Sequence, residues 1–395
     1  MFSQEILLST PVRTPIGNYN GSLKQTPAVE LGATVIKETL IRANLVPEAI
    51  DTVVMGNVVQ AGNKMNPARQ AAIHAGLSVN TPAMTVNRVC GSGAQAIVSA
   101  ALEIAVGAAD IAIAGGLENM DLAPYLMGGG RWGYRMGDAQ IYDSMLRDGL
   151  HDAFSDKHSG WHTEDLIAKY GISRKEQDEW ALRSHQLFTQ AQTEGKFTAE
   201  IVPVTISVKG GTLDFDKDET NRPDTSREKL AQLKSAFREN GTLTAGNSPG
   251  LNSGAAAVLV SNRAAAEKYG LRPVAKLLGY AVSAVEPGMF GIAPAPAIRT
   301  LVKRVGWALG EVERFEINEA YAAVPLAVIK ELGLDASRVN IEGGAVAHGH
   351  PIGATGAILT VRLLHSMKRD GLQRGIVALC IGGGQGIALA LEAVD

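Results

Sequence analysis

The stretch VNRVCGSGAQAIVSAALEIAVGAADIAIAGG, residues 86–116, shows the organisation of this chain most clearly. Residues 85–89 form a short strand pattern that runs directly into Cys90. Glycines then open a helical segment rich in small residues, 92–106, and a buried strand, 110–114, ends at a pair of glycines. Strands that alternate with helices in this way predict parallel pairing and a layered α/β domain.

The C-terminal part of the chain repeats this order of elements. Glycines at 353 and 356 accompany a predicted helix, 352–368, and a strand, 375–380, follows before three more glycines. The two stretches share little identity, but their common order indicates duplicated halves. Paired halves would bring together the helix N-termini that follow Val89 and Pro351. Periodicity also predicts strands at 274–283 and 314–317 and helices at 295–305 and 320–332.

The remaining segments divide the chain into parts, since 395 residues are too many for one ordinary core. Composition changes between residues 120 and 244, and we interpret this region as an inserted loop domain. It contains a clear helix, 173–193, with Ser173 as N-cap and Glu176 three residues on, and a polar loop, 209–229. Other predicted elements are strands at 5–9, 52–55 and 252–262 and helices at 27–43 and 67–75. The predicted parts are an N-terminal half (1–119 plus 245–270), the loop domain (120–244) and a C-terminal half (271–395).

Composition argues against several classes of function. The formal net charge is −3 and 19% of the residues are charged, so no basic field suggests a nucleic-acid partner. The most apolar segment, 94–114, contains Glu103 and Asp110, which argues against a membrane span. The N-terminus lacks the pattern of a secretory signal, and two cysteines without an evident pairing favour a reducing compartment. We therefore expect a cytoplasmic protein.

Cys90 has the position of a reactive thiol. Free amides at a helix start and the helix dipole favour a thiolate, and such cysteines have pKa values of about 3.5–7.5. Gly91 and Gly93 leave room for a bulky thioester. The sequence therefore predicts a cysteine nucleophile, with a buried structural cysteine as the alternative.

Further polar residues could complete such a site. His350 lies on a turn before a helix, where it could accept the thiol proton or merely satisfy a backbone group. Cys380 ends a buried strand, and the amides of glycines 382–384 form a nest for an anion, without the spacing of a dinucleotide loop. Asn318 follows a short strand and could orient an oxyanion or cap a helix. His348 has no companions at ligand spacing, so no metal site is predicted.

Several separated motifs together resemble one family, the thiolases (acetyl-CoA C-acyltransferases), nearly from end to end. They are VNRVCGSG at 86–93, GGLENM at 115–120, TAGN at 244–247, INEAY at 317–321, GGAVAHGHP at 343–351 and CIGGGQG at 380–386. Each motif alone is weak, but the set in this order is highly specific. The resemblance implies an α/β protein with a five-layered αβαβα fold, built of two similar halves with an inserted loop domain.

The resemblance also implies a role for each residue of the site. Cys90 would carry the acyl group, His350 would activate it, and Cys380 would move the proton at the α-carbon of the second acyl-CoA. A water held by Asn318, together with His350, would form one oxyanion hole, and the amides of Cys90 and Gly382 would form the other. The implied reaction is CoA-dependent thiolytic cleavage of a 3-ketoacyl-CoA and the reverse Claisen condensation, through an acyl-cysteine.

Substrate contacts follow from the resemblance as well. The implied acyl- and CoA-binding residues are His158, Phe290, Tyr321, Ser248 and Arg222. Serine follows His158, and Phe290 and Ser248 also depart from the best-known short-chain members, so the preferred acyl chain stays open. Coenzyme A is substrate and product, no tightly bound cofactor is implied, and fatty acid metabolism is the implied setting. The loop 128–137 corresponds to the one through which family dimers pair into homotetramers.

Other functions stay open at this point. A thiolase-like CoA-binding protein without turnover would be expected to have lost one of Cys90, Asn318, His350 and Cys380, and all four are present. A decarboxylating ketoacyl synthase combines one cysteine with two histidines or with histidine and asparagine, whereas this chain carries a second cysteine. A nicotinamide-dependent dehydrogenase would need a dinucleotide fingerprint.

Overall fold

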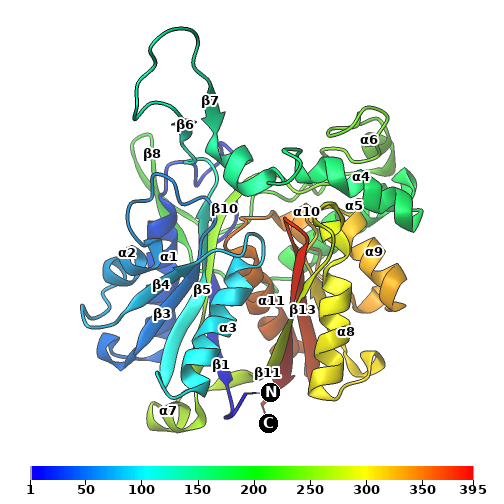
Figure 1. Cartoon of the computed structure of the whole chain (residues 1–395). Coiled ribbons are helices and arrows are strands. Elements are labelled where there is room, and N and C mark those ends of the chain that lie inside the picture. The colour runs from blue at the N-terminus through cyan, green and yellow to red at the C-terminus, as the bar shows by residue number, and fades with distance from the viewer. Residues whose placement is uncertain (1, 395) are drawn as a thin grey trace.

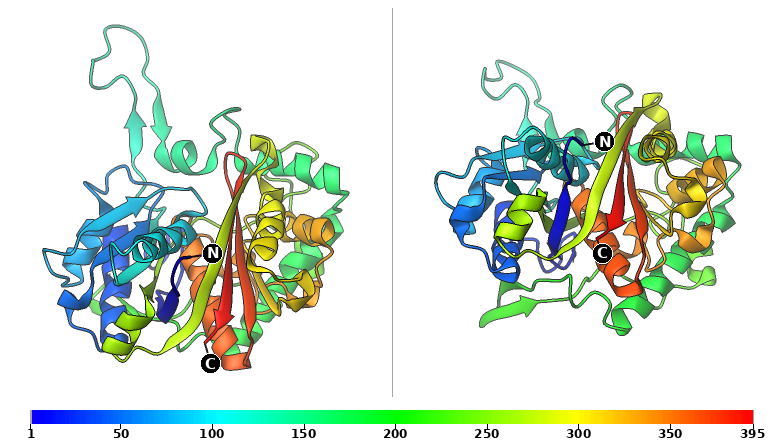
Figure 2. Two further views of the ribbon diagram at one scale, coloured as in Figure 1. Left: turned by 60° about the horizontal axis from the view of Figure 1, so that its bottom comes forward. Right: turned by 90° about the horizontal axis from the view of Figure 1, so that it is seen from below.

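Two similar α/β halves lie next to each other and share a middle layer of helices (Figure 1). The computed structural model describes residues 2–394. From one outer face to the other, the layers are helices, sheet, helices, sheet and helices, which confirms the expected five-layered architecture. Two further views show the blue and cyan N-terminal elements on one side and the yellow to red C-terminal elements on the other (Figure 2).

The strands pair in one continuous order across both halves. The N-terminal half has the order β4-β3-β5-β10-β1, and β1 also pairs with β11, the first strand of β11-β14-β13-β12. The parallel strands β4 and β12 lead into the segments that carry Cys90 and Asn318. The strands are β1 Leu7–Arg13, β2 Gly17–Asn18 (paired with β10), β3 Thr52–Gly56, β4 Ala83–Val86, β5 Ile111–Asn119, β10 Asn252–Ser261, β11 Pro273–Ala284, β12 Arg314–Ile317, β13 Arg374–Ile381 and β14 Gln385–Ala393.

Helices cover both outer faces and fill the space between the sheets. Helices α1 (Ala28–Ala43) and α2 (Pro67–His74) pack on the outer face of the N-terminal half. On the other outer face lie α8 (Pro294–Val305) and α9 (Ala323–Leu332), and the middle layer consists of α3 (Ser92–Ala105) and α11 (Thr355–Asp370). Short helices are α7 (Arg263–Lys268) and α10 (Ala345–His348). Within residues 2–394, none of the helices combines the length and apolar character needed to cross a membrane.

The two middle helices meet at their N-terminal ends through glycines. A Cβ atom on Gly93 would lie 2.5 Å from the amide nitrogen of Ala357, and one on Gly356 would lie 2.4 Å from that of Ala94. Only glycine permits so close an approach of two backbones. The predicted meeting of the two helix starts is therefore confirmed, and it brings the segment before α3 next to the segment before α11.

The inserted region contributes a projecting loop and a cover over one end of the sheets (Figure 1). Helix α5 begins with the predicted capping box of Ser173 and Glu176. The polar stretch 209–229 is not an irregular loop throughout, because it includes a hairpin strand and a short helix. The elements are β6 Tyr125–Met127, β7 Ile141–Asp143, α4 Ser159–Tyr170, α5 Arg174–Thr193, β8 Val204–Val208, β9 Gly211–Phe215 and α6 Arg227–Ala231.

Several boundaries differ from the sequence prediction. Strand β1 covers residues 7–13 instead of 5–9, and strand β4 covers 83–86 instead of 85–89, so irregular backbone separates it from Cys90. Strand β5 continues through the two glycines where we expected it to end, since a Cβ atom on Gly115 would lie 1.9 Å from a carbonyl oxygen of β10. Helix α9 begins at Ala323 instead of residue 320, and α11 begins at Thr355 instead of residue 352. Both late starts leave Asn318 and His350 on irregular backbone, so neither residue is an ordinary helix residue.

Candidate active site

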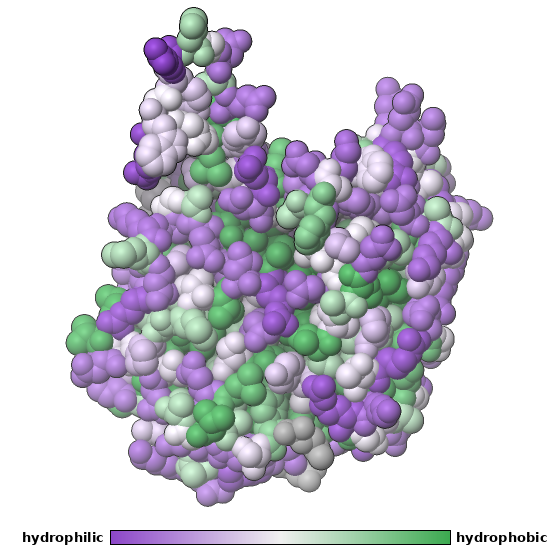
Figure 3. Space-filling view, viewed as in Figure 1, coloured by the Kyte–Doolittle hydropathy of each residue, from purple (hydrophilic) through white to green (hydrophobic). Residues whose placement is uncertain are grey.

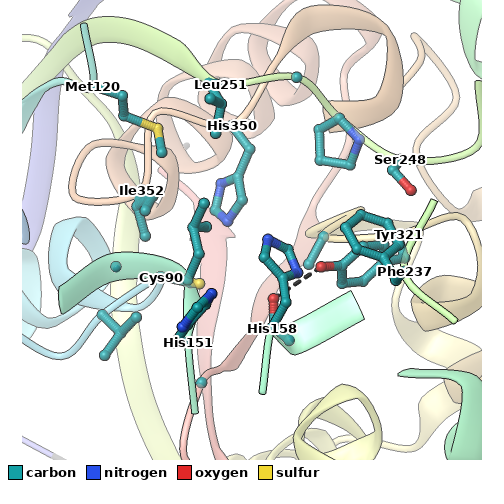
Figure 4. A pocket seen from close by; sticks show the side chains of 18 of the residues that line it. Cys90, Met120, His151, His158, Phe237, Ser248, Leu251, Tyr321, His350 and Ile352 are labelled. Atoms are coloured by element: carbon teal, nitrogen blue, oxygen red, sulfur yellow. Dashed lines mark hydrogen bonds between the residues drawn. The ribbon is translucent and has the colours of Figure 1, made fainter. Parts of the chain in front are cut away.

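A cavity of about 530 Å³ opens where the two halves meet the inserted region. Figure 4 shows Cys90, His350, His158 and Tyr321 directed into it. The predicted residues in its lining are Cys90, His158, Arg222, Ser248, Phe290, Tyr321, His350 and Gly382. Asn318 and Cys380 are fully buried in the protein behind this lining. The predicted site residues are therefore brought to one place from segments that are far apart in the chain.

Cys90 lies in a tight turn between β4 and α3. Val89 has a φ of 42°, a left-handed conformation that a β-branched residue rarely adopts. Ser92 Oγ accepts a hydrogen bond from the amide of Arg88 (2.9 Å) and donates one to the carbonyl of Val89 (2.7 Å). Strain of this kind persists only where surrounding contacts enforce it, and it gathers at functional sites. The hydroxyl of Ser92 therefore helps to hold the turn that presents the thiol.

The acidity of Cys90 differs from the sequence prediction. Burial raises the pKa of its thiol to about 11, even though the backbone amides of Gly382 and of Cys90 itself favour the ionised form. The charge of the buried carboxylate Glu118 adds to the increase. The prediction of a thiol acidified by the helix start is therefore wrong, because loss of water outweighs the amides. Cys90 rests as a neutral thiol, and its ionisation requires a base.

His350 is held so that one ring nitrogen carries a lone pair toward the site. Its Nδ1 lies 2.7 Å from Thr355 Oγ1, and that hydroxyl donates its own proton to the carbonyl of Pro351 at 2.8 Å. The hydroxyl can therefore only accept from Nδ1, which assigns the proton to Nδ1 and a lone pair to Nε2. Burial lowers the pKa of His350 to about 4, so the ring is neutral near pH 7. A neutral imidazole with a free Nε2 can accept a proton from a thiol.

Asn318 lies next to this imidazole. Its Nδ2 is 3.4 Å from His350 Nε2, and its backbone amide donates to the carbonyl of Ala378 in β13 at 2.9 Å. Its Oδ1 is buried and makes no hydrogen bond within the described residues. The expected alternative, a helix cap, does not apply because α9 begins five residues later. A fixed amide beside the imidazole suits the orientation of a small polar group.

Cys380 and the following glycines form the other side of the site. Burial raises the pKa of Cys380 well above that of an ordinary thiol, and the neighbouring Cys90 adds to the increase. Gly383 and Gly384 both have a φ of 84° and turn the chain from β13 into β14. The amide of Gly382, just before that turn, lies close enough to Cys90 to favour its thiolate. A negative charge that develops beside Cys90 would meet the same amide.

The facing wall carries aromatic rings and two hydroxyl groups. The ring of His158 stacks on Phe237 with centroids 4.7 Å apart, and Phe237 meets the ring of Tyr321 edge-on at 5.7 Å. The hydroxyl of Tyr321 lies 2.8 Å from Ser159 Oγ (dashed line in Figure 4). Burial lowers the pKa of His158 to about 4 and raises the pKa of Tyr321, so both groups are neutral at pH 7.

The other predicted contact residues lie at different places along the cavity. Phe290 is buried, in the short helix 287–292. Ser248 is also buried, and its hydroxyl has no hydrogen-bond partner within the described residues. Arg222 is exposed, and its backbone amide donates to His185 Nδ1 at 3.2 Å. The side chain of Arg222 is therefore free to meet a charged group at the cavity mouth.

Three polar residues that shape the site were not identified from the sequence. Thr355 sets the tautomer of His350, Ser92 holds the turn of Cys90, and Ser159 pairs with Tyr321. For the first two a local signal exists, since each hydroxyl lies within five residues of its partner at a helix start. The third pair is separated by 162 residues, and only the fold brings it together.

Two family models match almost the whole chain. The model described as "Thiolase, N-terminal domain" matches residues 7–264. The model described as "Thiolase, C-terminal domain" matches residues 271–393. Together these matches include Cys90 in the first segment and Asn318, His350 and Cys380 in the second.

Curated relatives and solved structures agree with the family models. An acetyl-CoA acetyltransferase of Chromobacterium violaceum is 49% identical over 98% of this chain and 99% of that protein, and one of Escherichia coli is 46% identical over 98% and 99%. The crystal structure of the Bacillus anthracis acetyl-CoA acetyltransferase superposes with a TM-score of 0.97 at 44% identity. That of human mitochondrial 3-ketoacyl-CoA thiolase superposes with a TM-score of 0.97 at 38% identity. Each superposition covers 100% of this chain and 100% of the chain in the solved structure.

Proposed function

Because this chain belongs to the thiolase family, we propose that its cavity is the site of a reversible acyl transfer through Cys90. The reaction is CoA-dependent thiolytic cleavage of a 3-ketoacyl-CoA and the reverse Claisen condensation of two acyl-CoAs. One observation carries the assignment of residues: Cys90 and His350 line one cavity, and Asn318 and Cys380, buried behind that lining, lie next to them.

The first step is the acylation of Cys90. As the sulfur attacks the carbonyl carbon of an acyl-CoA, its proton passes to Nε2 of His350, the nitrogen that carries the lone pair. The bond between the carbonyl carbon and the sulfur of CoA then breaks, and His350 returns the proton to the leaving thiolate. The charge on the carbonyl oxygen is stabilised by hydrogen-bond donors, each worth about 10²–10³ in rate. Here those donors are the amides of Cys90 and Gly382.

The second step forms or breaks the carbon–carbon bond. Cys380 first gives its own proton to Nε2 of His350, and its thiolate then removes a proton from the α-carbon of a second acyl-CoA. The resulting enolate attacks the acyl group on Cys90. The bond between that acyl group and the sulfur breaks, and the Cys90 thiolate takes the proton back from His350, which leaves the 3-ketoacyl-CoA and two neutral thiols. His350 and a water oriented by Asn318 stabilise the enolate oxygen in this proposal. In thiolysis the same groups act in the opposite order.

Coenzyme A is a substrate and product in this proposal, and no tightly bound cofactor takes part. Ser248 would meet the pantetheine arm, and Arg222, exposed at the cavity mouth, would meet the nucleotide end. The two ends of CoA would therefore lie at different depths of the same cavity. We propose a place in fatty acid metabolism and a cytoplasmic location.

A homotetramer is part of the proposal. The loop between β6 and β7 stands away from the body of the molecule (Figure 1) and projects at the upper left of the space-filling view (Figure 3). It carries large side chains that are open to solvent, with Trp132 86% and Met136 94% exposed. Apolar groups on a projecting loop are typical of a contact between protein chains. Its partner would be the same loop of a second dimer.

Acylation of the intact protein tests this function. Acetyl-CoA is expected to add one acetyl mass to the wild-type chain and none to Cys90→Ala, as measured by mass spectrometry. Equal labelling of the variant would contradict the assignment of the nucleophile. Thiolysis of 3-ketoacyl-CoAs of increasing chain length, with CoA as second substrate, then measures turnover and chain-length preference.

A further inference from the structure

The wall of the cavity beside Cys90 carries a hydroxyl pair that no step above uses. Ser159 Oγ and the hydroxyl of Tyr321 lie 2.8 Å apart, and either can donate to the other. Within residues 2–394, neither hydroxyl makes another hydrogen bond. Both residues line the same cavity as Cys90, and Tyr321 is only 5% exposed.

Counting protons and lone pairs shows what the pair can still do. Each hydroxyl has one proton to donate, and the bond between them uses only one of the two. One O–H donor is therefore left over, on Ser159 or on Tyr321. The phenol remains protonated at neutral pH because burial raises its pKa. The free donor is then a permanent feature of the wall.

His158 provides a second neutral donor in the same wall. Its Nδ1 accepts the amide proton of Gly160 at 3.0 Å, which assigns the ring proton to Nε2. The stacked ring of Phe237 holds its plane. Two uncharged donors therefore lie among aromatic surfaces.

We propose that this wall selects acyl groups that carry a neutral oxygen, a hydroxyl or keto group, beyond the carbonyl that reacts with Cys90. The inference rests on the proposed acylation of Cys90 and specifies the class of acyl chain. An aliphatic chain of equal length would displace water from the pair and leave its donor without a partner, which is costly. A chain with a correctly placed oxygen accepts that hydrogen bond. A carboxylate placed against the pair is disfavoured, because neither hydroxyl has a cation within hydrogen-bonding distance in the described part of the chain.

Matched CoA esters test the selection. The two pairs are pentanoyl-CoA against 4-oxopentanoyl-CoA and butyryl-CoA against 3-hydroxybutyryl-CoA. The measured quantity is the second-order rate of Cys90 acylation, followed by intact-protein mass spectrometry. The wild type is expected to favour the oxygenated ester in at least one pair by about threefold to tenfold, the value of one neutral hydrogen bond. Succinyl-CoA is expected to react no faster than butyryl-CoA.

Variants locate the donor. The double variant Ser159→Ala/Tyr321→Phe removes both hydroxyls, keeps the aromatic ring, and is expected to bring the preference to about one. Of the single variants, the one that abolishes the preference identifies the hydroxyl that donates to the substrate. Tyr170→Phe is the matched control: it removes a tyrosine hydroxyl that donates to Glu331 on the surface, and the preference should persist.

The outcomes separate this inference from the proposed function. A wild-type preference of one or less in both pairs overturns the inference, whether or not the variants fold. So does an unchanged preference in a folded double variant. If acetyl-CoA still acylates Cys90 in either case, the proposed function stands alone. If no ester acylates Cys90, the proposed function fails and the inference fails with it.

Discussion

Replacing Thr355 with valine removes the oxygen that orients His350 and keeps the branched shape of the side chain. In the structure, Nδ1–H of His350 donates to Thr355 Oγ1 at 2.7 Å, and the hydroxyl passes its own proton to the carbonyl of Pro351 at 2.8 Å. All three groups are buried. Valine leaves the Nδ1–H group without an acceptor and no longer favours the tautomer with a free Nε2.

The size of the effect follows from the burial of these groups. Leaving a buried donor without a partner costs about 1–3 kcal/mol. If that cost is relieved by moving the ring proton to Nε2, the active tautomer lies higher in free energy by a similar amount. Each 1.4 kcal/mol changes a rate tenfold, so acylation of Cys90 should slow by roughly 5- to 150-fold. The Michaelis constant for acetyl-CoA should hardly change, because Thr355 is not among the residues that line the cavity.

The assay is the single-turnover rate of acylation by acetyl-CoA, with Thr355→Ser as the matched control. Serine keeps the hydroxyl and should retain the rate within about threefold, whereas valine should not. Thermal unfolding of both variants reports any loss of stability separately. Equal rates for valine and the wild type would refute the proposed role of Thr355. Equal losses for valine and serine would indicate a packing effect instead of a hydrogen bond.

The remaining predictions concern the second cysteine, pH and packing. Cys380→Ser should still be acylated by acetyl-CoA but lose most of its turnover, and parallel loss of both would give Cys380 a different role. Burial lowers the pKa of His350 to about 4, so the base is protonated only near pH 4. The rate of acylation should therefore stay nearly constant as pH falls from about 7.5 to 5. A midpoint near 6.5 in a stopped-flow pH series would contradict that. Gly356→Ala places a Cβ atom 2.4 Å from backbone of α3 and should destabilise the fold by about 1–3 kcal/mol or more in urea titrations, whereas Gly310→Ala, with no atom within 4 Å, should change stability by less than about 0.5 kcal/mol.

The sequence predicted the fold and the position of the site, because both depend on local patterns that repeat. Around Cys90, a strand is followed by the cysteine, by glycines and by a helix of small residues, and this order predicts a nucleophile between two elements. The same order in the second half predicts His350 at an equivalent helix start. The positions at which α9 and α11 begin could not be predicted from these patterns. Periodicity marks where a helix is apolar, but it does not show which residues of an irregular turn leave it.

The electrostatics of the site could not be predicted from the sequence. A helix start favours a thiolate, and that rule considers only neighbours along the chain. How far the fold removes water from Cys90 is set by its tertiary surroundings, and the charge of Glu118 and the amide of Gly382 also act on the thiol from other segments of the chain. The Ser159–Tyr321 pair is similar, because its two members belong to the inserted region and the C-terminal half. Neither the ionisation of Cys90 nor the contact between Ser159 and Tyr321 can be predicted from neighbouring residues in the sequence.

Burial shifts the pKa values of Cys90 and His350 in opposite directions, and this bears on the proposed mechanism. It raises the pKa of Cys90 to about 11 and lowers that of His350 to about 4, so the resting pair is neutral. A preformed thiolate–imidazolium pair is then disfavoured, and in the proposed acylation the proton moves as the sulfur bonds to the thioester carbon. At that moment the negative charge appears on the carbonyl oxygen, and fixed amides stabilise an oxyanion without reorganisation. In the proposed mechanism, a site that disfavours both charged forms delays charge separation until a thioester is present, and a neutral thiol is less reactive toward other electrophiles than a thiolate.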